Sequence, residues 1–153
     1  MKPTILIVED EDPKRANIIS ALSELNISYD LIEARSVLSA INCLRATTPE
    51  LILLDMSLPT FDIAPRESGG RPQGFGGVEV LRYIDRFGLS VPVIVVTAYE
   101  AFSQGGKQIG LNDLGKQLLL SHGAVFSGMI YYNSVYEKWR EDLQKLVREV
   151  LKI

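Results

Sequence analysis

Runs of apolar residues without polar alternation mark the strands that we expect in this chain. Residues 51–54 are four consecutive apolar residues, and residues 5–8 and 93–96 repeat this pattern. Uninterrupted apolar runs of this length are typical of strands buried on both faces, as in a parallel sheet covered by helices. Residues 29–34 and 125–132 contain a second and a fifth strand.

Between these runs, apolar residues recur at the spacing of amphipathic helices. Asp12 and Ser36 are expected to cap the first two helices, and Ser134 the last. A helix near residues 78–88 and another near residues 111–121 complete the alternation. Strand alternating with helix predicts an α/β fold: a doubly wound, five-stranded parallel sheet of order 2-1-3-4-5, flavodoxin-like, with helices on both faces.

Chemically useful residues follow three of these strands. Glu9 and Asp10 come after the first, Asp55 after the third and Thr97 after the fourth. In open α/β sheets the carboxyl ends of the strands form the edge where ligands bind, so we expect these side chains to converge. The simpler alternatives are that a strand-ending Asp starts a turn and that acids favour a helix N-terminus.

This set resembles the receiver domain of two-component response regulators. The Asp-Met-x-Leu-Pro run from Asp55 and the Thr-Ala pair at Thr97 are also similar to that family. The resemblance implies that Glu9, Asp10, Asp55 and the carbonyl of Ser57 bind Mg²⁺. It also implies that Asp55 is the phosphoacceptor and that Thr97 contacts the phosphoryl group.

The resemblance implies a function as well as a fold. We expect a stand-alone, atypical receiver, phosphorylated on Asp55 by a histidine kinase or phosphotransfer protein and signalling through contacts with a downstream protein. Such a protein is not an enzyme beyond its own phosphorylation and dephosphorylation. The last helix pairs subunits in many relatives, so a homodimer is also considered.

One expected residue is missing. Receivers usually end the fifth strand with Lys-Pro, and the lysine pairs with the phosphoryl group. Here Ile130, Tyr131 or Tyr132 falls at that position, and a tyrosine carries no positive charge near neutral pH. The loss would weaken the site by about 1.5–3 kcal/mol, the contribution of a charge-assisted hydrogen bond.

Two segments are longer than in the family, at about residues 60–76 and 101–121. The first is rich in Gly, Pro and charge and is predicted to be an extended loop. Arg66 and Arg71 in it, or Lys107 in the second segment, are candidate replacements for the missing lysine. The simpler interpretation of residues 60–76 is a solvated insertion.

Two other functions remain open. The missing lysine and the enlarged segments favour a pseudo-receiver, an interaction module that phosphate does not switch. Asp10-Glu11-Asp12 also contains the Asp-x-Asp signature of haloacid-dehalogenase-like phosphatases. Against that, Pro13-Lys14 replaces the expected small or hydroxyl residues, and no later acidic pair ends a strand.

Composition sets limits on these functions. The 153 residues fit a single domain over residues 1–153, and a net charge of −3 gives no case for nucleic-acid binding. Cys43 is the sole cysteine, so no intrachain disulfide forms and a reducing cytoplasm fits best. No secretion signal and no apolar run near the roughly 20 residues of a membrane helix is visible.

Overall fold

Five parallel strands form the central sheet of the protein, whose structure is a computed structural model that describes residues 2–62, 76–98, 101–104 and 107–153. The strands stand in the order β2-β1-β3-β4-β7, which is the predicted 2-1-3-4-5 with the last strand numbered after a separate hairpin. Their bounds are β1 Thr4–Val8, β2 Asp30–Ala34, β3 Leu51–Leu54, β4 Val93–Thr97 and β7 Phe126–Tyr131.

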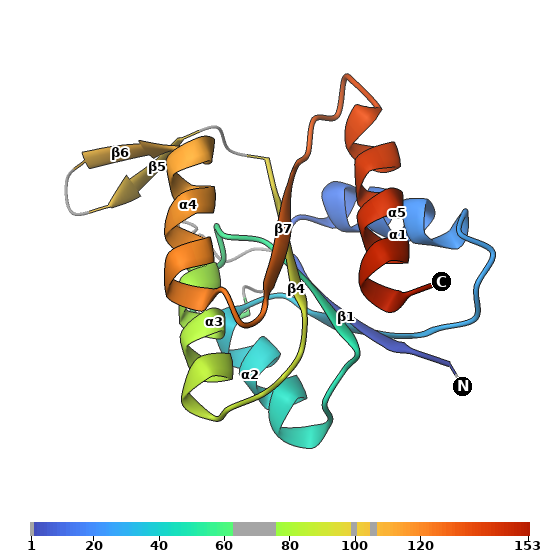
Figure 1. Ribbon diagram of the computed structural model, residues 1–153, viewed down its shortest axis with the longest axis horizontal. Helices are drawn as coiled ribbons and strands as arrows, with labels where there is room; N and C mark the ends of the chain where they lie inside the picture. The colour runs from blue at the N-terminus through green and yellow to red at the C-terminus, as the bar shows by residue number, and fades with distance from the viewer. Residues whose placement is uncertain (1, 63–75, 99–100, 105–106) are drawn as a thin grey trace.

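Helices cover both faces of this sheet (Figure 1), as the sequence predicts. Two helices pack on one face and three on the other, and each face has its own apolar core. On the first face are α1 Asp12–Ser23 and α5 Lys138–Leu151; on the second are α2 Val37–Ala46, α3 Gly76–Arg86 and α4 Leu111–His122.

β3 shows why the apolar runs do not alternate. Leu51 and Leu53 belong to the core beneath α1 and α5, whereas Ile52 and Leu54 belong to the core beneath α2, α3 and α4. All four side chains are at most 1% exposed. A central parallel strand therefore needs apolar residues on both faces.

The second predicted insertion, at about residues 101–121, contains regular secondary structure in its described residues. It contains an antiparallel hairpin, β5 Ala101–Gln104 and β6 Lys107–Gly110, followed by α4. The hairpin projects away from the sheet beside the start of α4 (Figure 1). Residues 63–75, most of the other predicted insertion, lie outside the described residues.

The helix starts match the sequence predictions only in part. Ser36 caps α2 as predicted, with its hydroxyl and that of Ser39 forming a capping box. The prediction for Asp12 is wrong, because Asp12 is the first residue of α1 and its carboxylate pairs with Arg15 and Arg35. Ser134 also precedes its helix by several residues. No described helix is long and apolar enough to cross a membrane.

Candidate functional site

The acidic residues predicted from the sequence meet at the carboxyl edge of the sheet. Backbone ladders continue past the strands here: the amide of Asp55 donates to the carbonyl of Val8 at 3.0 Å, and the amide of Glu9 to that of Ala34 at 3.0 Å. As a result, carboxylate oxygens of Glu9, Asp10 and Asp55 all lie within 4.8 Å of one another. Glu9 and Asp55 are buried, and Asp10 is half-buried.

The loop after β3 holds Asp55 in place. Met56, Ser57 and Leu58 are all buried in this loop, so the chain leaves the strand through the core rather than through solvent. The amide of Gly77 at the start of α3 donates to the carbonyl of Met56 at 2.9 Å. Ser57 is buried in this loop, and the role of its carbonyl as a Mg²⁺ ligand stays a prediction.

Thr97 completes the predicted set at the end of β4. Its side chain is fully buried, and it stands in register with Tyr131 of β7. The amide of Tyr132 donates to the carbonyl of Thr97 at 2.8 Å, which ties the ends of β4 and β7 together. The structure thus brings Glu9, Asp10, Asp55 and Thr97 to one edge.

Lys14 is a member of this site that reasoning from the sequence missed. Its ammonium lies 2.7 Å from Oε1 of Glu9 and 3.2 Å from Oδ1 of Asp55, and it donates to the carbonyl of Val96 at 2.8 Å. The side chain is 2% exposed. A lysine buried to this extent needs such partners, because an unpaired buried charge is strongly unfavourable.

A helical pattern could have found this lysine. Lys14, Ile18 and Leu22 are spaced four residues apart and form the buried stripe of α1. Extending the apolar stripe back by one turn leads to Lys14, so its side chain must enter the protein. Its position in the first turn, next to the strand end, then directs the ammonium toward the carboxylates.

Burial and mutual repulsion shift the pKa values of the site. Desolvation, followed by the charge of Asp55, raises the pKa of Glu9 to about 8 despite the opposing effect of Lys14. The same two causes raise the pKa of Asp10. Desolvation would lower the pKa of Lys14, but the carboxylates of Asp55 and Glu9 outweigh it and raise that pKa.

These residues fit a divalent cation. Mg²⁺ prefers carboxylate and carbonyl oxygens and keeps several waters, so a few protein ligands are enough. Three carboxylates against one ammonium leave two negative charges when all are ionised. Burial is the main cause of the raised pKa values of Glu9 and Asp10, and the negative charge of Asp55, which a divalent cation would neutralise, adds to it.

The end of β7 carries no cation among the described side chains. Tyr132 directly follows β7: it is 7% exposed, its hydroxyl accepts a hydrogen bond from Asn17 at 2.7 Å, and its ring packs on Trp139. Arg66 and Arg71 lie outside the described residues, and so does the side chain of Lys107. None of the three candidate replacements is therefore tested.

Comparison with known proteins identifies the family. The family model of the response regulator receiver domain matches residues 5–114. The chain belongs to the response regulator receiver family. The uncharacterized protein y4jR of Sinorhizobium fredii (strain NBRC 101917 / NGR234) is 32% identical over 138 residues, covering 88% of this chain and 90% of the relative.

One further relative and one solved structure match nearly the whole chain. The Detocs response regulatory protein DtcB of Enterobacter cloacae (strain JD6301) is 26% identical over 148 residues, covering 95% of this chain and 99% of the relative. The crystal structure of the phosphorylated cyanobacterial phytochrome response regulator RcpA has the same fold, with a TM-score of 0.69 at 22% identity. The match covers 99% of this chain and 95% of that one.

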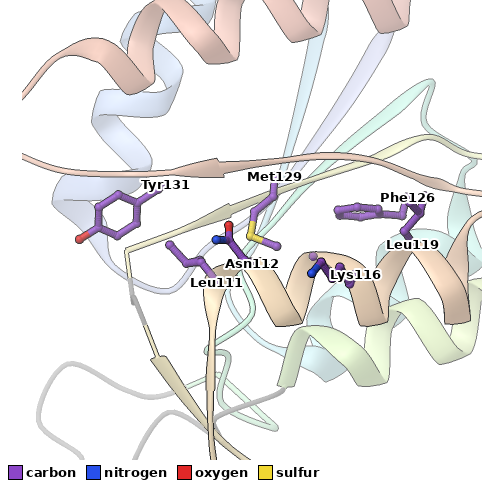
Figure 2. Close-up of a pocket in the computed structure, with 8 residues that line it drawn as sticks. Leu111, Asn112, Lys116, Leu119, Phe126, Met129 and Tyr131 are labelled. Atoms are coloured by element: carbon purple, nitrogen blue, oxygen red, sulfur yellow. The ribbon is translucent and has the colours of Figure 1, made fainter.

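A groove lies between α4 and β7 of this receiver. Its cavity volume is about 460 Å³, and Figure 2 shows Met129 and Phe126 of β7 facing Leu111 and Leu119 of α4. Tyr131 lines both this groove and a second hollow beside Lys14. One strand residue therefore borders both the surface groove and the neighbourhood of the acidic cluster.

Proposed function

We propose that this receiver accepts a phosphoryl group on Asp55 in a Mg²⁺-dependent reaction. The donor would be a histidine kinase or phosphotransfer protein, and the output would be contact with a downstream protein. The observation that carries the proposal is the convergence of the Glu9, Asp10 and Asp55 carboxylates within 4.8 Å, at the edge of the sheet where β4 ends in Thr97.

The chemistry needs a carboxylate nucleophile and groups that stabilise charge. An oxygen of Asp55 attacks the phosphorus of the donor in line, and the bond from phosphorus to the donor breaks as the donor leaves with its electron pair. Glu9, Asp10, Asp55 and the carbonyl of Ser57 would hold Mg²⁺, which neutralises charge on the transferring oxygens when bound. The hydroxyl of Thr97 would donate a hydrogen bond to one of those oxygens.

The groove between α4 and β7 is the surface that we propose for a downstream protein. It is lined mainly by apolar residues, and Leu119 on its rim is 60% exposed. Its position beside the end of β7 gives it a structural connection to Thr97 through Tyr131. Protein contacts of this kind are favoured where apolar side chains gather on a surface.

The phosphatase alternative finds no support in the geometry. The carboxylate of Asp12 is 68% exposed and pairs with Arg15 and Arg35 on the surface. The second acid of an Asp-x-Asp pair would have to face the same site as Asp10. We therefore propose no catalytic turnover, and hydrolysis of p-nitrophenyl phosphate by the protein would contradict this.

The absence of a lysine in residues 126–132 favours the pseudo-receiver alternative. The deciding experiment incubates the protein with Mg²⁺ and acetyl phosphate and records intact mass. We expect a Mg²⁺-dependent phosphate adduct in the wild type and in the matched control Asp113→Asn, an exposed aspartate. Asp55→Asn should show no adduct. An unmodified wild type that also fails to accept phosphate from any histidine kinase or phosphotransfer protein would favour the pseudo-receiver.

A further inference from the structure

Lys14 places a buried ammonium against the proposed nucleophile. The ammonium donates hydrogen bonds to Oδ1 of Asp55 and to the carbonyl of Val96, and it forms an ion pair with Oε1 of Glu9. One of these partners, the carboxylate of Asp55, is the group that would accept the phosphoryl group. The lysine comes from α1, not from the end of the last strand.

The surroundings of Lys14 fix this arrangement. The ammonium lies 5.9 Å from the centre of the Tyr132 ring, a distance at which a cation is attracted to an aromatic face. Tyr132 is itself held from two sides, by the amide of Asn17 on α1 and by the ring of Trp139 on α5. Tyr132, which directly follows β7, therefore packs beside a lysine supplied by α1.

We propose that Lys14 binds the phosphoryl group on Asp55 and supplies from α1 the positive charge that the end of β7 lacks. This inference rests on the proposed function. Phosphorylation removes the carboxylate charge of Asp55 and adds about two negative charges on the phosphoryl oxygens. The ammonium that paired with Oδ1 then has those oxygens as its new partners, while the carbonyl of Val96 still holds it in place.

A contrary role is also chemically reasonable. An ammonium between Glu9 and Asp55 resembles a resident cation, and such a cation would compete with Mg²⁺ for the same carboxylates. The two roles predict opposite effects of removing the charge. Loss of a phosphoryl ligand slows phosphorylation, whereas loss of a competitor strengthens Mg²⁺ binding and leaves phosphorylation intact or faster.

The test compares Lys14→Met with Lys138→Met, a lysine that is 79% exposed on α5. Folding is checked by circular dichroism and Mg²⁺ binding by the fluorescence of Trp139, the sole tryptophan. At saturating Mg²⁺ and acetyl phosphate, we expect Lys14→Met to be phosphorylated about ten- to a hundredfold more slowly, as for the loss of one charge-assisted hydrogen bond. Lys138→Met should match the wild type.

A second variant separates a phosphoryl ligand from a structural lysine. The double variant Lys14→Met/Tyr132→Lys supplies a positive charge from the residue after β7 instead of from α1. We expect it to be phosphorylated at least tenfold faster than Lys14→Met. If Lys14 only stabilised the fold of α1, a lysine at position 132 would not restore the rate of phosphorylation. If the wild type forms no adduct, the proposed function fails. If the wild type is modified and Lys14→Met keeps its rate within twofold, this inference fails alone.

A measurement on the wild type covers the case in which Lys14→Met does not fold. In protein labelled with ¹⁵N-lysine, the ammonium resonance of Lys14 is followed with Mg²⁺ alone and then with Mg²⁺ and beryllofluoride, which mimics the phosphoryl group. We expect beryllofluoride to shift that resonance and to slow its hydrogen exchange. An ammonium resonance that beryllofluoride leaves unchanged would overturn the assignment.

Discussion

The surroundings of Glu9 disfavour the ionised form of its carboxyl group. Burial and the charge of Asp55 raise its pKa from 4.5 to about 8. In the metal-free protein the folded state therefore holds a proton that the unfolded chain releases above pH 4.5. Because the folded state binds more protons across that window, its stability falls as the pH rises from 4.5 toward 8.

Mg²⁺ binding should show the opposite dependence on pH. The cation needs the carboxylates ionised, so protons compete with it until the pH passes the raised pKa of Glu9. We expect the affinity for Mg²⁺ and the increase in Tm that it causes to be larger at about pH 8.5 than at about pH 6, by roughly tenfold or more in affinity. Titration of the Trp139 fluorescence with Mg²⁺ at each pH measures this.

The matched control is Glu9→Gln, which keeps the size of the side chain and mimics its protonated form. This variant should bind Mg²⁺ more weakly, and it should keep only the smaller pH dependence that comes from Asp10. An affinity that changes with pH as steeply in Glu9→Gln as in the wild type would assign the dependence to another group.

Lys14 illustrates which site residues the sequence could predict. Glu9, Asp10, Asp55 and Thr97 follow apolar runs directly, and the parallel sheet brings all strand ends together, so their convergence could be predicted. Lys14 lies in a helix, and its role depends on how α1 is rotated and on the space beside Tyr132. The four-residue spacing of Lys14, Ile18 and Leu22 indicates that its side chain enters the protein, whereas tertiary packing sets its contacts with the carboxylates.

At the scale of elements, the start of α3 is fitted closely to the loop that carries Asp55. A Cβ placed on Gly77 would clash with the carbonyl oxygen of Asp55 and with the side chain of Met56. Gly115 in α4 offers a matched comparison, because a Cβ there meets only the end of Met129 at 3.5 Å, an ordinary contact. Both glycines lie in helices, and they differ in the room that their surroundings leave for a Cβ atom.

Gly77→Ala and Gly115→Ala should therefore move stability in opposite directions. We expect Gly77→Ala to lower the free energy of unfolding by about 1–3 kcal/mol through overpacking, and to slow phosphorylation because the Asp55 loop shifts. Gly115→Ala should raise the free energy of unfolding by up to about 1 kcal/mol, since alanine favours a helix interior. Urea denaturation measures both, and equal effects would contradict the close fit at Gly77.

The hairpin of β5 and β6 is the element that the sequence analysis did not predict. Its strands are only four residues long and combine polar and apolar residues, so no apolar run or alternation marks them. The available signal was Gly105-Gly106, a glycine pair between two short runs, which is typical of a two-residue hairpin turn. Strands with buried faces could be predicted, whereas this pair has no apolar pattern to reveal it.

For the whole molecule, the architecture follows from the order of its elements. Strand alternating with helix, and right-handed crossovers, lead to one sheet with helices on both faces, so the fold could be predicted. The groove could not, because it depends on how the side chains of α4 and β7 meet. That groove and the hollow beside Lys14 share Tyr131, which stands in register with Thr97.

This shared strand end predicts that the site and the groove respond together. A phosphoryl analogue that orders Thr97 should also order β7 and, through it, the helix packed on it. We therefore expect Mg²⁺ with beryllofluoride to slow amide hydrogen exchange in α4, Leu111–His122, by about twofold or more, measured by mass spectrometry of peptides. Asp55→Asn, which leaves no phosphoacceptor, should show no such change.

The extent of the exchange change then separates the two functions of this fold. A switch requires that binding at the Asp55 site changes the free energy of binding at the groove. If protection appears in α4 as well as at the strand ends, the groove senses the state of Asp55, and a downstream protein bound there can distinguish the two states. If protection stays within the loops after β1, β3 and β4, phosphate can bind without changing the groove. The receiver would then act as an interaction module that phosphorylation does not switch.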